Sequence, residues 1–245
     1  MEVTSGKRIV IGIQARSTSK RFPGKVFASL GQSTVLGNVL NAVKGAAMYI
    51  NQNEARRGYH CSFCLLVPYN DPITDNYKAH FFEGPEDDVL ARYKIMADRL
   101  KPDYIVRITA DCPMIPSPSI SKLIKIAVKN GYDYAANFFE TKTDRKVVRL
   151  VPDGFDCEVF SRRMLDWADL NAKEMSDREH VTTIMRTYPE WGKFGVVLPY
   201  LDSSEKKISV DTQSDLDNVR REMATLDEAR KMATTLFGPN ATHRY

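Results

Sequence analysis

The chain has 245 residues, 43% of them hydrophobic and 27% charged, which is typical of a globular enzyme and excludes a disordered protein. Its 35 basic and 31 acidic residues leave a net charge of +4, too small to indicate a nucleic-acid partner. No apolar run approaches the ~20 residues of a membrane-spanning helix, and the first residues lack a signal-peptide core. We therefore expect a cytoplasmic protein without a membrane or nucleic-acid partner.

A basic loop follows the first predicted strand. The strand, Ile9 to Ile13, is apolar throughout, as is typical of a strand buried on both faces. Cationic and hydroxyl side chains that directly follow a strand lie at the carboxyl edge of the sheet, where open α/β folds bind ligands. The preceding strand favours a bound nucleoside triphosphate over two alternatives, a solvated basic turn and a contact with nucleic-acid backbone. The loop residues concerned are Arg16, Ser17, Thr18, Ser19, Lys20, Arg21 and Lys25.

The next elements indicate a parallel sheet. An apolar stripe predicts a helix over residues 35–49, with Ser33 or Thr34 as its N-cap, followed by a loop over 51–59. A second buried strand is predicted from Ser62 to Val67 and ends at a proline-rich turn. The order strand, loop, helix, strand suggests parallel strands joined by right-handed crossovers.

Four cysteines invite a metal-site hypothesis, which their spacing weakens. Cys61 and Cys64 match a C-x-x-C spacing, but Cys112 and Cys157 are isolated, and a zinc ribbon needs a second pair. Because the pair enters an apolar run, buried structural thiols are the favoured interpretation.

A short strand and a helix follow. Residues 81–84 predict a strand, and the Pro85–Asp88 segment is expected to open a helix that ends near Lys101. Within that helix, Asp88 and Arg92 have the i, i+4 spacing of an ion pair.

Two aspartates follow two predicted strands. Asp111 comes after the strand Tyr104–Ile108, and Asp211 ends the short strand predicted over 207–212. Carboxylates beside bound phosphates repel them unless a divalent cation lies between, and Mg²⁺ is held by one or two carboxylates plus phosphate oxygens. Turn or helix capping is the alternative for each residue. The pair together favours a metal–phosphate site.

The remaining elements offer weaker indications. Asp156 and Glu158 would share one face of a strand, and Ser176 with Glu179 fits a capping box. A structural or surface histidine is the favoured interpretation of His180 over a catalytic one. Further strands are predicted over 132–139 and 147–151, helices over 119–129, 164–171, 176–188 and 213–231, and loops over 140–146 and 238–245.

Six sequence blocks, in order along the chain, carry a family resemblance. Together they resemble the cytidylyltransferases that make CMP-activated sugar acids such as CMP-KDO and CMP-sialic acid, and they are most similar to the SpsF-type spore-coat polysaccharide proteins. The loop departs from the SpsF pattern M-G-S-T-R, since it lacks that glycine and gains Lys20, which moves it toward the sialic-acid type. The blocks are residues 14–25 (QARSTSKRFPGK), 86–93 (EDDVLARY), 107–115 (RITADCPMI), 152–160 (PDGFDCEVF), 178–182 (REHVT) and 210–212 (VDT).

The resemblance implies a fold and partners. The expected fold is α/β, a Rossmann-like nucleotidyltransferase (GT-A-like) of three layers with a mostly parallel central sheet. Residues 1–245 would form one nucleotidyltransferase domain, with a small dimerisation insert around 138–165. CTP as nucleotide donor, Mg²⁺ as cofactor and a homodimer are also implied.

The resemblance further implies roles for individual residues. Arg16, Lys25 and Asp111 would be catalytic, and Asp111 with Asp211 would bind Mg²⁺. The residues expected to hold the nucleotide are Ala15, Arg16, Ser19, Lys20, Arg21, Lys25, Arg107 and Thr109. Those expected on the acceptor side are Asn137, Asp156, Glu158, Glu179 and His180.

The predicted reaction is transfer of CMP from CTP to an acidic acceptor (sugar acid, phosphate or phosphonate) with release of pyrophosphate. A glycosyltransferase that uses a nucleotide-sugar in surface polysaccharide biosynthesis is one alternative, and a non-catalytic nucleotide-binding protein is another. A dehydrogenase and a P-loop NTPase are disfavoured because neither glycine-rich motif is present. Cations available to an acidic acceptor, or to a solvated face, are Arg145, Lys146, Arg149, Arg162, Arg163 and Arg178.

Overall fold

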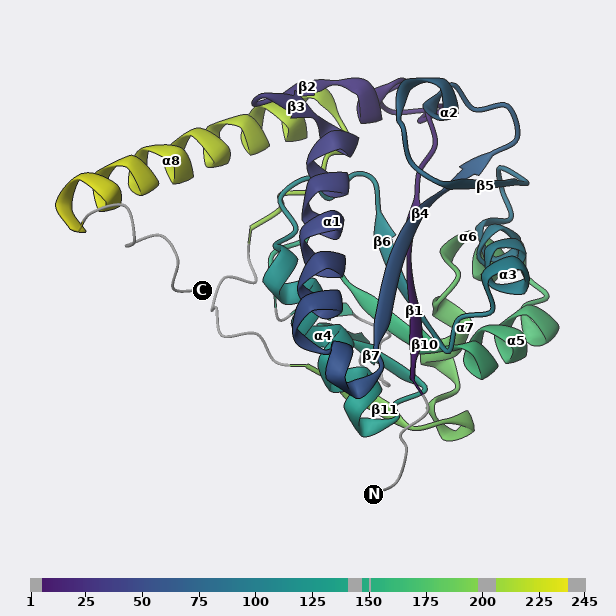
Figure 1. Cartoon of the computed structure of the whole chain (residues 1–245). Coiled ribbons are helices and arrows are strands. Elements are labelled where there is room, and N and C mark those ends of the chain that lie inside the picture. The colour runs from purple at the N-terminus through teal and green to yellow at the C-terminus, as the bar shows by residue number, and fades with distance from the viewer. Residues whose placement is uncertain (1–5, 141–146, 150, 198–205, 238–245) are drawn as a thin grey trace.

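A seven-stranded, mostly parallel sheet forms the centre of the molecule (Figure 1). The computed structural model describes residues 6–140, 147–149, 151–197 and 206–237. The strand order is β11-β7-β10-β6-β1-β4-β5. β10 runs antiparallel to both of its neighbours, and the other pairings are parallel. The strands are β1 (Arg8–Gln14), β4 (His60–Pro68), β5 (Phe81–Gly84), β6 (Tyr104–Thr109), β7 (Tyr134–Ala136), β10 (Glu158–Ser161) and β11 (Phe194–Val196).

Helices cover both faces of this sheet, which gives the three layers expected for the α/β fold. One face packs against α1 (Val35–Asn53) and α4 (Ser117–Asn130), and its core includes Ile11 and Val43. The other face packs against α3 (Val89–Leu100), α5 (Arg162–Asn171) and α7 (Thr183–Thr187), and α6 (Met175–His180) contacts α3 and α7. The remaining elements are α2 (Ile73–Asn76), the 3₁₀ turns η1 (Lys25–Phe27), η2 (Ala55–Arg57) and η3 (Pro189–Trp191), and the hairpins β2 (Ser29–Leu30)–β3 (Ser33–Thr34) and β8 (Phe138–Glu140)–β9 (Val147–Arg149).

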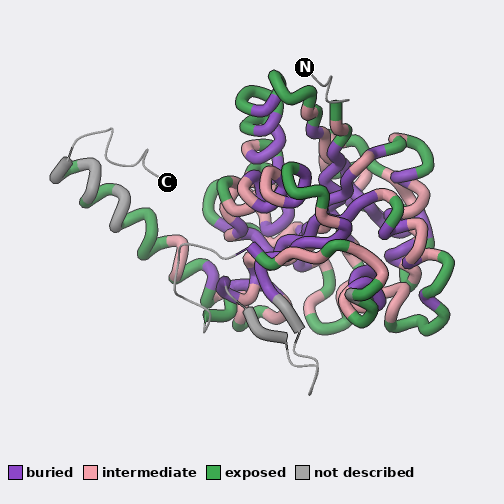
Figure 2. Tube along the Cα trace, turned by 90° about the horizontal axis from the view of Figure 1, so that it is seen from below, coloured by how far each residue is buried: buried purple, intermediate pink, exposed green. Residues whose placement is uncertain are grey.

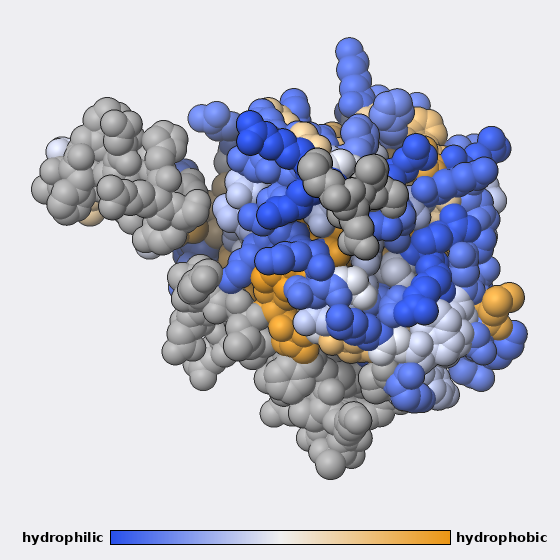
Figure 3. All heavy atoms as spheres, turned by 60° about the horizontal axis from the view of Figure 1, so that its bottom comes forward, coloured by the Kyte–Doolittle hydropathy of each residue, from blue (hydrophilic) through white to orange (hydrophobic). Residues whose placement is uncertain are grey.

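The long helix α8 (Gln213–Phe237) is attached to the body by its first turns. Leu216 and Val219 are buried with Val210 in a small third core, whereas Leu226 is 45% exposed. Figure 2 shows the helix leaving the body after these buried turns. On the face seen in Figure 3, hydrophilic side chains predominate and hydrophobic side chains gather in small patches. Within the described residues, no helix is long and apolar enough to cross a membrane.

The early elements match the sequence predictions closely. β1 and β4 contain the predicted strands, and α1 begins as expected with the hydroxyl of Thr34 accepting a hydrogen bond from the Gly37 backbone. The predicted loop over 51–59 is shorter, because α1 continues to Asn53 and η2 follows. All four cysteines are buried and free, which confirms them as structural thiols. Burial raises the pKa of Cys61 and Cys64 to about 12.

The start of α3 corrects one prediction. The helix begins at Val89, and Asp88 is its N-cap, accepting a hydrogen bond from the Ala91 backbone at 2.8 Å. The predicted Asp88–Arg92 pair is wrong: Asp88 binds Arg178 at 2.5 Å, and Arg92 is 2% exposed. The reason is the helical period, since positions 89, 92, 93 and 96 share the face that packs on the sheet.

The predicted strand 132–139 is divided at Asn137. Its side-chain amide accepts a hydrogen bond from the Cys157 backbone at 3.0 Å and donates one to the Phe155 carbonyl at 2.8 Å. These side-chain bonds, with one from the Asn137 backbone to the Cys157 carbonyl at 3.4 Å, hold the chain where it leaves the main sheet for the β8–β9 hairpin. β10 starts only at Glu158, so Asp156 lies outside the strand in which it was predicted.

Two later predictions also need correction. Residues 207–212 form no strand and carry a single bridge, between Lys207 and Asp153. The predicted helix 176–188 is two helices, because Val181 has φ 61° and interrupts it. The capping box at Ser176 is wrong as well, since α6 starts earlier, with Glu174 at its N-cap position.

Gly12 in β1 offers a test of how tightly α3 packs on the sheet. A Cβ at Gly12 would lie 2.7 Å from Cε1 of Tyr93 and 2.9 Å from Cδ1 of Leu66, both fully buried. We expect Gly12→Ala to lower the free energy of unfolding by about 1–3 kcal/mol through overpacking. Urea unfolding followed by circular dichroism measures this, and an unchanged midpoint would contradict the packing described.

Candidate active site

The basic loop leaves the carboxyl end of β1 and returns to the protein interior at Lys25. The Ala15 backbone donates to the Leu66 carbonyl at 3.0 Å, and the Gly24 backbone donates to the Ser17 carbonyl at 2.9 Å, which closes the loop. Gly24 has φ 70°, a left-handed conformation that glycine adopts without a steric penalty. Lys20 and Arg21 are therefore exposed on the loop, while Lys25 is 8% exposed.

Lys25 joins the two predicted metal-binding aspartates. Its Nζ donates to Oδ2 of Asp111 at 2.8 Å, to Oδ1 of Asp211 at 3.2 Å and to the Val210 carbonyl at 2.7 Å. The Arg21 guanidinium lies 2.8 Å from Asp211. Three segments that are distant in sequence thus meet at one ammonium group: the basic loop, the turn after β6 and the segment before α8.

At this junction, against the effect of burial, the positive charge of Lys25 lowers the pKa of Asp111. Burial alone would raise the pKa of Asp111, but the charge and hydrogen bond of Lys25, with a hydrogen bond from Thr109, hold that pKa below its ordinary value. Asp111 is therefore a carboxylate near neutral pH, able to accept hydrogen bonds or bind a cation.

The donor set at this junction fits a magnesium ion that also binds phosphate. Asp111 and Asp211 present carboxylate oxygens, the hard ligands that Mg²⁺ prefers. The described residues contain no group of three or more His, Cys, Asp and Glu side chains that could hold a metal ion alone. A cation at this place would therefore need phosphate or water oxygens as well, which is the usual mode for Mg²⁺ beside nucleotides.

Arg16 lies between two carboxylates at the other end of the loop. Its guanidinium is 4.0 Å from Glu86 and 3.8 Å from Glu179, and its side chain is 40% exposed. The hydroxyl of Thr18 also donates to Glu86. Glu179, predicted for the acceptor side, is thus brought to the basic loop, whereas Glu86 was predicted only to start a helix.

Arg107 and Glu158 form a buried charge network under the carboxyl edge of the sheet. Glu158 is 1% exposed, and its carboxylate lies 2.5 Å from Arg107, 2.9 Å from Arg186 and 2.5 Å from the Tyr134 hydroxyl. Burial would raise the pKa of Glu158, but the two guanidinium groups outweigh burial and lower it. Arg107 also donates to the Gln14 side chain at 2.9 Å.

The remaining predicted site residues differ in their contacts and exposure. Thr109 contacts Cys112 at 3.0 Å, and Ser19 lies partly exposed in the basic loop. Asn137 is 6% exposed and tied to the chain before β10, while Asp156 is partly exposed and His180 exposed. The sequence analysis missed Arg186, because nothing in its local pattern distinguishes it from a surface arginine.

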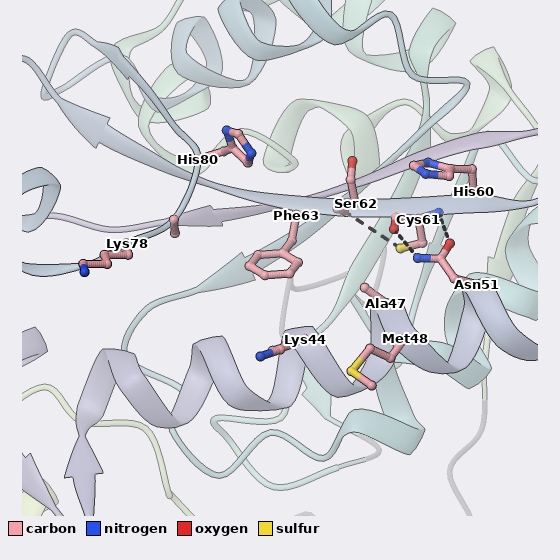
Figure 4. A pocket seen from close by; sticks show the side chains of 11 residues that line it. Lys44, Ala47, Met48, Asn51, His60, Cys61, Ser62, Phe63, Lys78 and His80 are labelled. Atoms are coloured by element: carbon pink, nitrogen blue, oxygen red, sulfur yellow. Dashed lines mark hydrogen bonds between the residues drawn. The ribbon is translucent and has the colours of Figure 1, made fainter.

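A groove of about 670 Å³ lies away from this junction (Figure 4). α1 contributes Lys44, Met48 and Asn51, and the first half of β4 contributes Phe63. None of the residues predicted for nucleotide, metal or acceptor lines it. Asn51 exchanges two hydrogen bonds, each of 2.8 Å, with the Cys61 backbone, as a neighbouring strand would.

Comparisons with known proteins agree with this architecture. A cytidylyltransferase from Leptospira borgpetersenii superposes with a TM-score of 0.76 at 24% identity, covering 97% of this chain and 98% of its own. A CMP-2-keto-3-deoxy-manno-octonic acid synthetase in complex with CTP superposes with a TM-score of 0.63 at 14% identity, covering 89% and 99%. The fold is therefore that of the cytidylyltransferases, a class of nucleotidyltransferases.

Two proteins are related to this chain in sequence. The uncharacterised protein MJ1063 of Methanocaldococcus jannaschii is 30% identical over 213 residues, 84% of this chain and 79% of its own. The spore coat polysaccharide biosynthesis protein SpsF of Bacillus subtilis is 26% identical over 227 residues, 86% and 85% respectively. No family model matches the chain. The chain belongs to the same family as MJ1063 and has SpsF among its relatives.

The buried network predicts the effect of Glu158→Gln. The substitution removes the buried carboxylate charge that Arg107 and Arg186 both contact, so we expect a loss of about 3 kcal/mol or more in the free energy of unfolding. Urea unfolding measures it, with Glu190→Gln as the control because Glu190 is exposed. Unchanged stability would show that Glu158 does not hold this part of the sheet.

The lowered pKa of Asp111 predicts an acid-dependent stability. Its pKa in the folded state lies below the ordinary value of 3.8, so its contribution is present above that value and is lost as the pH falls through the folded-state pKa. The stability difference between the wild type and Asp111→Asn should therefore be largest near neutral pH and shrink below about pH 4. Urea titrations from pH 7 to 3 measure it, and a constant difference would contradict the assignment.

Proposed function

We propose that this protein transfers CMP from CTP to a small acceptor, with Mg²⁺ as cofactor and pyrophosphate as the second product. The observation that carries the proposal is the meeting of Lys25 with Asp111 and Asp211 beside the exposed cations of the basic loop. The cytidylyltransferase fold, the CTP-bound structural neighbour and the relative SpsF support it.

The proposed roles follow from the charges and their positions. Arg16, Lys20 and Arg21 are arranged along a closed loop and would hold the triphosphate, with Ser19 as a hydroxyl donor. Lys25 would offset the charge that develops on the leaving pyrophosphate, and positioning with charge neutralisation is most of what phosphoryl transfer requires. Asp111 and Asp211 would hold Mg²⁺, which when bound polarises the phosphate.

The other predicted contacts complete the proposal. The backbone at Ala15 and the segment from Arg107 to Thr109 would recognise cytosine and ribose. Because Arg107 is bound to Gln14 and Glu158, its contribution would be to hold that strand end in place. The proposed acceptor side comprises Asn137, Asp156, Glu158, Glu179 and His180.

The acceptor is proposed to be acidic: a sugar acid, phosphate or phosphonate. Three of the arginines considered for it are already in ion pairs, Arg162 with Asp98 and Asp166, Arg163 with Asp133, and Arg178 with Asp88 and Asp169. Arg145, Lys146 and the side chain of Arg149 lie outside the described residues. The proposed cations for an acidic acceptor are therefore those of the basic loop, Arg16 among them.

Assembly and location belong to the same proposal. We propose one nucleotidyltransferase domain that works as a cytoplasmic homodimer, with the β8–β9 hairpin in the dimerisation insert. Of the predicted insert, residues 138–165, β10 belongs to the central sheet, so the insert proposed here is confined to the hairpin and its connections. The Bacillus subtilis relative is a spore coat polysaccharide biosynthesis protein, which supports a role in polysaccharide biosynthesis.

A screen of pyrophosphate release tests the reaction. Each NTP is combined with Mg²⁺ and with sugar acids, sugar phosphates and phosphonates, and we expect release with CTP alone, dependent on acceptor and abolished by EDTA. Transfer from a preformed nucleotide-sugar without pyrophosphate release would instead support the glycosyltransferase.

Arg16→Ala tests the proposed site within that reaction. Removing one cation that faces transferred or leaving phosphate costs on the order of 10³ in rate, so we expect turnover near background. Arg56→Ala, at an exposed arginine of η2, is the control. Turnover of Arg16→Ala close to that of the control would remove Arg16 from the site.

A further inference from the structure

Two buried residues of opposite charge hold the backbone on either side of Arg16. Arg92, on α3, is 2% exposed and donates a hydrogen bond to the carbonyl of Ala15, the residue before Arg16. Asp71, after β4, is 4% exposed and accepts a hydrogen bond from the backbone of Ser17, the residue after Arg16. Neither has a role in the function proposed above. Their placement leaves the side chain of Arg16 as the exposed group between them.

Arg92 ties three chain segments together through their carbonyl groups. Its guanidinium donates to the carbonyl oxygens of Ala15 at 3.2 Å, Leu66 at 2.9 Å and Glu86 at 3.3 Å. These carbonyls stand at the carboxyl ends of β1 and β4 and in the turn after β5. Gly84 leaves room for this side chain, since a Cβ there would lie 2.7 Å from Cγ of Arg92. A buried guanidinium that binds carbonyls alone fixes positions at a high desolvation cost, which points to a need for accurate placement.

Asp71 holds the loop from the opposite direction. One carboxylate oxygen accepts hydrogen bonds from the Ser17 backbone at 2.9 Å and the Ser17 hydroxyl at 3.1 Å. The other oxygen accepts from the Ile73 backbone at 3.0 Å. The carboxylate therefore links the start of the basic loop to α2, which packs through the buried Ile73.

We propose that Asp71 and Arg92 are positioning residues that together fix Arg16 for binding of the triphosphate. The inference rests on the proposed function, in which Arg16 meets the phosphates of CTP. Arg92 also connects Arg16 to Glu86, because one guanidinium binds the carbonyls of Ala15 and Glu86 while the Glu86 carboxylate lies beside Arg16. A displacement of the loop by about 1 Å is enough to weaken catalysis up to a hundredfold, so a rigid attachment has a functional consequence.

The test compares CTP with CMP, which lacks the β- and γ-phosphates of the triphosphate that Arg16 is proposed to bind. Calorimetry gives both dissociation constants for the wild type, Arg92→Met and Asp71→Asn, with the exposed Arg99→Met and Asp75→Asn as matched controls. We expect the affinity for CTP to fall about tenfold or more in the first two variants, with little change for CMP. Arg92→Lys, which keeps the charge, should restore part of the loss.

Two further measurements separate positioning from general stability. Urea midpoints show whether a variant has merely become less stable, which would not change the ratio of CTP to CMP affinity. Hydrogen exchange of residues 15–24 without nucleotide should be faster in Arg92→Met and Asp71→Asn than in their controls. If either fails to fold, Arg92→Lys and Ser17→Ala replace them, since Ser17→Ala removes only the hydroxyl bond to Asp71.

The outcomes distinguish the two proposals. If the wild type binds CTP and the variants keep its CTP-to-CMP affinity ratio and its exchange rates, the positioning role of Asp71 and Arg92 is wrong and the proposed function stands. If the wild type binds no CTP, the proposed function fails, and the exchange rates of residues 15–24 still decide whether Asp71 and Arg92 fix the loop.

Discussion

The ammonium group of Lys25 is the interaction on which the arrangement of the site depends. It is buried and is held by two carboxylates and one carbonyl that belong to the turn after β6 and to the segment before α8. A buried charge is tolerated only where such partners satisfy it. The requirement of one lysine for partners, together with the backbone hydrogen bonds of residues 206–210 to Asp111 and Asp153, therefore fixes how the basic loop, the central sheet and the start of the last helix meet.

Other charged residues in the interior also link elements of the fold through their hydrogen bonds. Glu158 links β6, β7, β10 and α7 through Arg107, Tyr134 and Arg186, and Arg92 links the ends of β1 and β4. Each lies below the carboxyl edge of the sheet, where the exposed cations gather. These buried charged residues that link elements thus lie on helices and strands, whereas Arg16, Lys20 and Arg21 on the basic loop are accessible.

Local patterns predicted the elements whose sequence signals agree with their surroundings. The apolar run of β1, the stripe and threonine cap of α1 and the burial of Cys61 and Cys64 followed from composition and period alone. Two of the wrong predictions come from single residues that interrupt an otherwise regular pattern. Asn137 divides a strand by binding the chain before β10, and Val181 divides a helix at a positive φ that a β-branched residue rarely adopts.

The sequence alone determined that a basic loop follows a buried strand and that two aspartates come after later segments, because strand and turn signals are local. The sequence alone did not determine which charged side chains of a helix are buried. Arg92 has the spacing of a surface ion pair with Asp88, yet it is buried. Only the tertiary structure brings Lys25 to Asp111 and Asp211, separated from it by 86 and 186 positions. Contacts over such distances arise from the packing of the whole sheet and its helices, which no local pattern encodes.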